Sequence, residues 1–95
     1  MTYIIGENSS GKTHKMLEEA KKNNAVVICK HPIHMQNKAN GYGIYGLKFI
    51  SYEEMNMGIL EEENVAVDEL GEFFEYRFGV KLDSFTMTVD WKEVK

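Results

Sequence analysis

The chain has 95 residues, of which 43% are hydrophobic, and a formal net charge of −4 at pH 7. This length and composition suit one globular domain with a modest core. The acidic balance gives no broad electrostatic footprint for nucleic acid or an anionic membrane, and no apolar run reaches the length of a transmembrane helix.

The N-terminal residues and the cysteine content bear on the compartment. A candidate strand begins at Tyr3, close behind Met1, so we expect no secretory signal peptide. Cys29 is the only cysteine, which leaves no intrachain disulfide framework and favours a reducing environment. We therefore expect a cytoplasmic protein that forms a single domain over residues 1–95.

The most specific motif lies near the N-terminus and matches G-x-x-x-x-G-K-[ST] at every fixed position. Its residues are Gly6, Glu7, Asn8, Ser9, Ser10, Gly11, Lys12 and Thr13. In such a loop the glycines let the backbone approach a phosphate closely, and successive backbone N–H groups bind it. Lys12 is expected to reach the β- and γ-phosphates, and the Thr13 hydroxyl is expected to hold Mg²⁺. The alternative is a flexible Gly/Ser turn before an ordinary helix.

The sequence around the motif favours the phosphate loop over that alternative. Residues 3–5 form a short apolar run typical of a buried strand. A helix is expected from Lys12 to about Asn23, ended by the Asn23-Asn24 pair, which tolerates a left-handed stop. Its inner face would consist of Met16, Leu17 and Ala20. Residues 25–29 are an unbroken apolar run, which predicts a strand buried on both faces of a parallel sheet.

The segment from residue 30 to 46 is predicted to be a loop, because it contains Pro32 and several glycines and shows little periodicity. Within it and just before it, Cys29, His31 and His34 have the spacing C-x-H-x-x-H. A structural zinc site needs four ligands and no second cysteine is present, so surface histidines are the favoured interpretation.

Two tyrosines in the same segment allow two interpretations. Tyr42 and Tyr45, with Lys38 and Lys48 nearby, can stack on a nucleotide base or cover it. Turn-rich aromatic sequence more often packs back on its own domain. The second interpretation is favoured.

Residues 47–50 predict a short strand, and a helix is expected to follow it. Ser51 and Glu54 have capping-box spacing, so this helix should begin at Tyr52. Its inner face would consist of Met55, Ile59 and Leu60. The acidic run over residues 61–64 is interpreted as a solvated connection.

A second informative stretch is an apolar strand, residues 65–67, that ends in Asp68 and Glu69. This pattern resembles a Walker B motif. Asp68 is expected to provide a direct or water-mediated oxygen for the Mg²⁺ beside the phosphates. Glu69 is expected to orient or deprotonate the attacking water or hydroxyl. The alternative is that the two acids only begin the next helix, where negative charge suits the N-terminal turn.

The rest of the chain predicts one helix and one strand. Leu70, Phe73, Phe74 and Phe78 mark an amphipathic helix that ends at Gly79. Arg77, the only arginine, can serve as an arginine finger across an oligomer interface or, more plainly, complement the helix dipole. Residues 85–91 alternate apolar and polar side chains, which indicates an edge strand or a strand with polar groups facing the site.

With both motifs placed, the chain resembles P-loop NTPases of the branch whose Walker B strand carries a catalytic Glu. This branch includes RecA-like ATPases, helicase and packaging motors, and type II thymidine kinases. The resemblance covers residues 1–79 in the order of elements, and is specific at Gly6–Thr13 and at Val65–Glu69. It departs from thymidine kinases in lacking their four-cysteine zinc segment and from the motors in lacking a second domain.

The resemblance implies an α/β, three-layer domain with a mainly parallel sheet of four to five strands, reduced in size. It implies that the protein binds ATP or another nucleoside triphosphate with Mg²⁺ and hydrolyses it, with Lys12 and Glu69 as the catalytic residues. A nucleotide-dependent interaction module or inhibitor of a larger replication or packaging assembly is a second hypothesis. A small nucleoside or nucleotide kinase is a third. A protein partner or homo-oligomer fits these hypotheses, whereas nucleic acid and membrane are not indicated.

Overall fold

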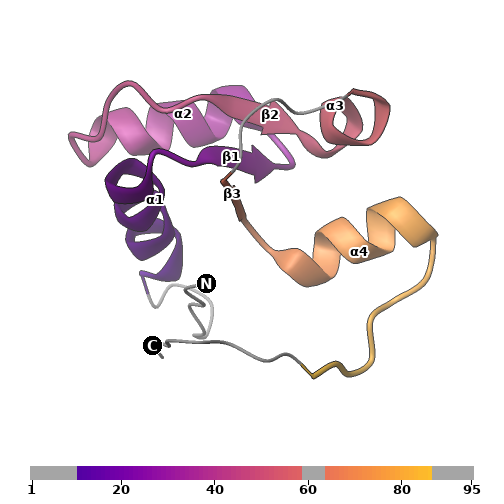
Figure 1. Ribbon diagram of the computed structural model, residues 1–95. Coiled ribbons are helices and arrows are strands. Elements are labelled where there is room, and N and C mark those ends of the chain that lie inside the picture. The colour runs from indigo at the N-terminus through magenta and orange to yellow at the C-terminus, as the bar shows by residue number, and fades with distance from the viewer. Residues whose placement is uncertain (1–10, 59–63, 87–95) are drawn as a thin grey trace.

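The computed structural model describes residues 11–58 and 64–86. In these ranges the chain alternates helices and strands (Figure 1). The elements are α1 (Lys12–Asn23), β1 (Val26–Cys29), α2 (Pro32–Gly41), β2 (Phe49–Ser51), α3 (Tyr52–Met57), β3 (Val65–Val67) and α4 (Leu70–Phe78). The strand expected at residues 3–5 lies outside the described residues, as does most of the one expected at residues 85–91.

The strands form one parallel sheet in the order β2-β1-β3. In its register, Ile28 of the central strand lies opposite Ile50 on one side and Val67 on the other. Every residue of β1 is buried, as its unbroken apolar sequence predicts for a strand covered on both faces. The α/β class and the parallel arrangement are therefore confirmed for the described part of the chain.

Helices cover both faces of this sheet. On one face, α1 and α2 pack over Val27 and Cys29 in a cluster that includes Leu17 and Met35. On the other face, Val26 and Ile28 contact a smaller cluster containing Ile50 and Tyr52, against which side chains of α3 and α4 pack. Alternate residues of β1 thus point into two separate cores, because successive side chains of a strand project to opposite faces.

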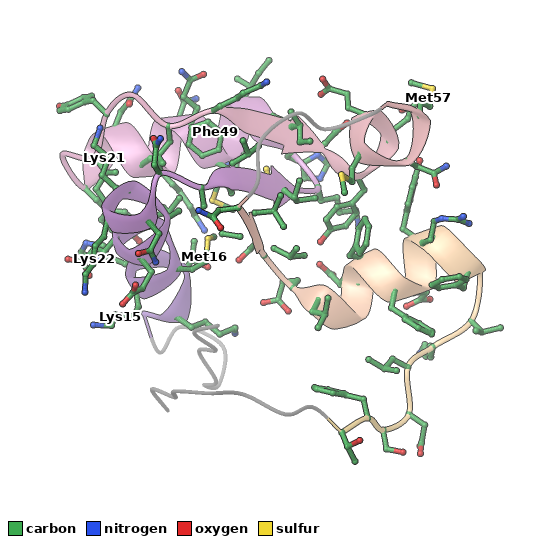
Figure 2. The ribbon with its side chains drawn as sticks, in the orientation of Figure 1. Lys15, Met16, Lys21, Lys22, Phe49 and Met57 are labelled. Carbon is green, nitrogen blue, oxygen red and sulfur yellow. The ribbon has the colours of Figure 1, made fainter. Side chains whose placement is uncertain are left out.

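Helix α1 spans the residues expected of it. Its inner residues Met16, Leu17 and Ala20 are buried, and Figure 2 shows Met16 pointing toward the strands while Lys15 and Lys22 point away. Asn24 ends the helix in the left-handed conformation, with φ 55° and ψ 44°. Its backbone N–H bonds carbonyls of the last turn, which is how such a residue satisfies groups that the helix leaves unpaired.

The prediction of a loop over residues 30–46 was wrong, because most of that segment is helix α2. Pro32 suits its first turn, where a backbone N–H has no helical partner. The helix buries only Met35 and Ala39, which are one turn apart, and its remaining residues are polar or exposed. With so few apolar positions, the helical period was too weak to recognise in the sequence.

Helix α3 begins at Tyr52, where expected, but ends at Met57, and the expected inner residues Ile59 and Leu60 lie outside the described residues. The Ser51 side chain accepts a hydrogen bond from the Glu54 backbone N–H at 3.0 Å, and the Ser51 N–H donates to the Glu54 carboxylate at 3.1 Å. This capping box starts α3 at Tyr52. Helix α4 ends at Gly79, which takes a left-handed φ of 75°. None of the described helices is both long enough and apolar enough to cross a bilayer.

Candidate functional site

The two sequence motifs meet at the start of α1 and the end of β3. The Thr13 hydroxyl donates a long hydrogen bond of 3.5 Å to Oδ1 of Asp68. The Lys12 ammonium lies 3.5 Å from Oε1 of Glu69. Each of the two expected site residues on α1 therefore contacts one of the two expected carboxylates, although the motifs are far apart in the chain. The structure does not describe Gly6, Glu7, Asn8, Ser9 and Ser10, which form the rest of the expected loop.

Backbone geometry brings these side chains together. Gly11 precedes α1 in a left-handed conformation with φ 85°, which glycine adopts without steric cost. The Asp68 N–H donates to the Ile28 carbonyl at 3.0 Å, so the end of β3 is held against the central strand. Asp68 is thereby placed at the carboxyl end of the sheet, where open α/β folds bind ligands.

The turn from β3 into α4 orients the carboxylates toward α1. Glu69 occupies the N-cap position of α4 with φ 57° and makes no side-chain capping hydrogen bond. The Tyr52 hydroxyl donates to the Asp68 carbonyl at 2.7 Å and approaches the Glu69 carbonyl at 3.3 Å, which braces this turn from α3. The two acids stand at the start of α4, and their side chains also reach α1, Asp68 at Thr13 and Glu69 at Lys12.

The local environment raises the pKa of the Asp68 carboxyl above its usual range. Burial is the largest cause, and the neighbouring negative charge of Glu69 adds to it. Lys38, the Thr13 hydroxyl and Lys12 act in the opposite direction. Burial and the charge of Glu69 thus disfavour the ionised form of Asp68. A cation bound beside Asp68 would favour that form.

The oxygens of Thr13 and Asp68 fit a Mg²⁺ ion. Both are hard oxygen donors, and a hydroxyl that donates its proton to Asp68 keeps its lone pairs for a cation. Two oxygens in adjacent positions around Mg²⁺ would be about 3 Å apart. Thr13 and Asp68, 3.5 Å apart, are the residues that would hold such an ion, directly or through water.

Three residues near the site were not assigned to it from the sequence. Tyr52 braces the turn through its hydroxyl, and Lys38 acts on Asp68 from helix α2. His14 stacks on Tyr42 with ring centroids 3.9 Å apart and an interplanar angle of 1°, so Tyr42 packs back on its own domain. The capping box indicated that Tyr52 begins a helix, but no local signal shows where a hydroxyl or an ammonium will point.

A hollow of about 680 Å³ opens at the carboxyl end of β1. Its described lining residues are Lys30, His31, Pro32, Ile33, His34 and Asn37. Lys30 follows Cys29, which lies one position beyond the register pair Ile28 and Val67, so the hollow begins beside the strand end that carries Asp68. Its size is within the range of small-molecule pockets.

Cys29 does not share that hollow. Its side chain is fully buried, and its thiol lies 3.9 Å from the Ile50 carbonyl. Burial, together with the charge of Asp68, raises the pKa of the Cys29 thiol to about 11. Within residues 11–58 and 64–86, no group of three or more His, Cys, Asp or Glu residues is arranged to hold a metal ion.

Arg77 lies in the last turn of α4, with its guanidinium 5.2 Å from the ring centroid of Phe78. Glu69 marks the other end of this helix. At about 1.5 Å per residue the two ends are on the order of 10 Å apart. The guanidinium of Arg77 therefore contacts Phe78, its neighbour on α4.

Comparison with known proteins gave no match to a family model, to a curated protein or to a solved structure.

Proposed function

We propose that the protein binds a nucleoside triphosphate, ATP or a close analogue, with Mg²⁺ and hydrolyses it, in the manner of a small P-loop NTPase. One observation carries this proposal. Two motifs with complementary roles, separated by 55 positions, converge so that Thr13 meets Asp68 and Lys12 meets Glu69. If residues 6–13 were only a flexible turn and Asp68 and Glu69 only the start of a helix, these two contacts would not be expected.

In the proposed reaction each residue has a separate task. Backbone N–H groups of Gly6–Thr13 bind the phosphates, and Lys12 places a positive charge on the β- and γ-phosphates. Thr13 and Asp68 hold Mg²⁺, which neutralises phosphate charge when bound. Glu69 positions the attacking water and accepts its proton.

Under this proposal, the ion pair between Lys12 and Glu69 would be exchanged for a phosphate contact when nucleotide binds. The Glu69 side chain is 42% exposed, so water reaches it. A phosphate entering the loop offers Lys12 more negative charge than one carboxylate does, so Lys12 would move to the phosphate. Glu69 is then free to bind the attacking water.

Calorimetric titration with ATP and Mg²⁺ tests the proposal, with Lys12→Ala and Lys22→Ala compared with the wild-type protein. We expect binding at micromolar concentration, lost in Lys12→Ala and kept in Lys22→Ala, which removes the same charge from a side chain that points away from the strands. Glu69→Gln should still bind ATP but lose at least about 100-fold in turnover, as for removal of a general base. Failure of the wild-type protein to bind millimolar ATP would contradict the proposal.

Phosphoryl transfer to a small acceptor is a second candidate, favoured by the hollow beside β1. An acceptor held there would lie next to the strand end that carries Asp68 and Glu69. Turnover of ATP measured with and without added nucleosides and nucleoside monophosphates separates the two reactions. Stimulation that yields a phosphorylated acceptor supports transfer, whereas release of inorganic phosphate at an unchanged rate supports hydrolysis.

A further inference from the structure

The Tyr52 side chain is fixed between the sheet and helix α4. Tyr52 is the first residue of α3, directly after β2, and the capping box of Ser51 and Glu54 holds the backbone there. Its side chain is 4% exposed and lies in the apolar cluster that contains Ile28 of the central strand. Phenylalanine would satisfy this packing equally well, so the role of the Tyr52 hydroxyl has to come from its hydrogen bonds.

The Tyr52 hydroxyl binds the backbone of both expected carboxylate residues. It donates to the Asp68 carbonyl at 2.7 Å and approaches the Glu69 carbonyl at 3.3 Å. The Glu69 carbonyl also accepts the first backbone hydrogen bond of α4, from the Phe73 N–H at 3.1 Å. The Phe73 ring in turn meets the Tyr52 ring edge-on at 5.1 Å. The turn between β3 and α4 is therefore attached to α3 by a polar contact at its backbone and by an aromatic contact one helical turn later.

Glu69 has a backbone conformation that residues of its type seldom adopt. With φ 57° and ψ 68° it lies in the left-handed region, which costs free energy for a residue with a Cβ. An ordinary N-cap residue is extended and turns its side chain to the free N–H groups of its own helix. Glu69 makes no side-chain capping bond, and its carboxylate lies 3.5 Å from the Lys12 ammonium. The left-handed backbone thus directs this side chain away from α4 and toward α1.

We propose that Tyr52 is a positioning residue of this site, whose hydroxyl holds Glu69 in the left-handed conformation and so keeps the Glu69 carboxylate facing Lys12. The consequence for catalysis rests on the proposed function, in which Glu69 orients the attacking water and accepts its proton. A general base has to lie within hydrogen-bond reach of the proton that it accepts. A change of the Glu69 backbone that turns the carboxylate away would therefore remove the base from the reaction.

This role predicts that loss of the hydroxyl slows turnover without weakening nucleotide binding. Phosphate binding is assigned to Gly6–Thr13, and Tyr52 acts on the turn that carries the carboxylates. Asp68 is held a second time by its own N–H, which donates to the Ile28 carbonyl at 3.0 Å, so its place at the end of β3 should survive without the hydroxyl. A residue that only stabilised the fold would not separate the rate of turnover from binding in this way.

The test compares Tyr52→Phe, which removes only the hydroxyl, with Tyr76→Phe, the same change on an α4 side chain that is 48% exposed. NMR couplings report the sign of φ at Glu69 in the protein without nucleotide, and steady-state hydrolysis of ATP with Mg²⁺ gives kcat and KM. We expect Tyr52→Phe to lose the positive φ of Glu69. It should also lower kcat about tenfold or more and change KM by less than about threefold, because a small misplacement of a reacting group slows chemistry steeply. Tyr76→Phe should match the wild-type protein in all three quantities.

A double variant separates positioning of Glu69 from a general effect on the fold. If Tyr52 acts through the Glu69 carboxylate, adding Tyr52→Phe to Glu69→Gln should lower kcat no further. A further fall in kcat, or a positive φ at Glu69 that persists in Tyr52→Phe, would contradict the inference. If the wild-type protein does not hydrolyse ATP, the proposed function is overturned, and the NMR couplings alone decide whether Tyr52 sets the conformation of Glu69.

Discussion

The two faces of the sheet differ in how completely their helices are buried. On the face of α1 and α2, the helices bury Met16, Leu17, Ala20, Met35 and Ala39. On the other face, α3 buries only Tyr52, and α4 has no buried residue in the part of the chain that the structure describes. Phe73 is partly buried there, while Phe78 is 59% exposed. Among the described residues, the α1–α2 face is therefore the more extensively buried one.

We call the α1–α2 side of the sheet the firm face and the α3–α4 side the weak face. The residues of the candidate site are divided between these two faces. Lys12 and Thr13 come from helix α1 of the firm face, whereas Asp68 and Glu69 come from the turn between β3 and α4. Strand β3 itself is exposed or half-buried along its length. The groups proposed to bind phosphate thus stand on the more buried helix, and the carboxylates proposed to handle metal and water stand next to the less buried one. A ligand that bridges both halves would stabilise the weaker one most.

The largest expected effect comes from shortening a side chain on each face. Leu17→Ala should lower the free energy of unfolding by about 3 kcal/mol, because the Leu17 side chain is fully buried and its loss leaves a cavity. Phe73→Ala should cost about half as much or less, because Phe73 is only partly buried and its ring meets Tyr52 edge-on at 5.1 Å.

Urea denaturation followed by circular dichroism measures both costs. Leu17→Met, which largely conserves volume, is the control for the first variant and should cost less than about 1.5 kcal/mol. Equal losses for Leu17→Ala and Phe73→Ala would show that the two faces contribute alike.

A smaller effect is expected from alkaline pH, and it acts on the firm face through Cys29. Burial raises the pKa of the Cys29 thiol from 9.0 to about 11. Because the folded-state pKa is the higher one, this contribution to stability is fully present below pH 9 and is lost as the pH rises toward 11. The loss is on the order of 2 kcal/mol, since one pKa unit corresponds to about 1.4 kcal/mol.

Unfolding free energies of wild type and Cys29→Ala between pH 8 and 11 isolate this effect. The alanine variant should be less stable at pH 8, because a buried sulfur is removed, but its stability should fall less steeply with pH. Parallel curves would refute the role given to Cys29.

The smallest effect is expected on the weak face, and it increases stability. The raised pKa of Asp68, caused first by burial and then by Glu69, means that the folded protein favours the protonated carboxyl. Asp68 therefore adds to stability at low pH, and this contribution is lost as the pH rises through the folded pKa. Asp68→Asn, which keeps the shape without the charge, should raise the unfolding free energy at pH 7 and flatten its dependence on acidic pH.

The same substitution should weaken Mg²⁺-dependent nucleotide binding under the proposed function. If Asp68→Asn is more stable but binds nucleotide less tightly, the Asp68 carboxylate serves ligand binding and not the stability of the fold. Thermal unfolding at pH 5 and 7 with and without Mg²⁺ and ATP tests both parts, with Asp83→Asn as an exposed control. Lower stability of Asp68→Asn at pH 7 would contradict the sign derived from the pKa.

Several elements of the fold were predictable because their signals are local. The limits of α1 follow from the apolar face of Leu17 and its neighbours and from an asparagine that tolerates a left-handed conformation. Ser51 and Glu54 carry the α3 capping box within a single turn. Gly79 ends α4 for an equally local reason. The buried strand β1 is visible as a run of apolar residues.

The candidate site was predictable only in part. The sequence indicated which residues have the chemistry of phosphate and metal binding, namely Lys12, Thr13, Asp68 and Glu69, and their functional assignment stays a prediction. Their convergence depends on β3 pairing with β1, which is a contact between distant segments and has no local signature. Tyr52 joins the site only through packing between distant segments.

The sequence by itself thus determined the α/β class of the fold and the helices and strands whose residues carry strong periodicity or caps. Tertiary structure decided that residues 32–41 form a helix. Met35 and Ala39 are buried in the core, but two apolar residues are too few to show a helical period in the sequence. It also decided the strand order β2-β1-β3 and the stacking of Tyr42, at the end of α2, on His14 of α1. These features depend on contacts between residues far apart in the chain, and a local pattern carries no information about such contacts.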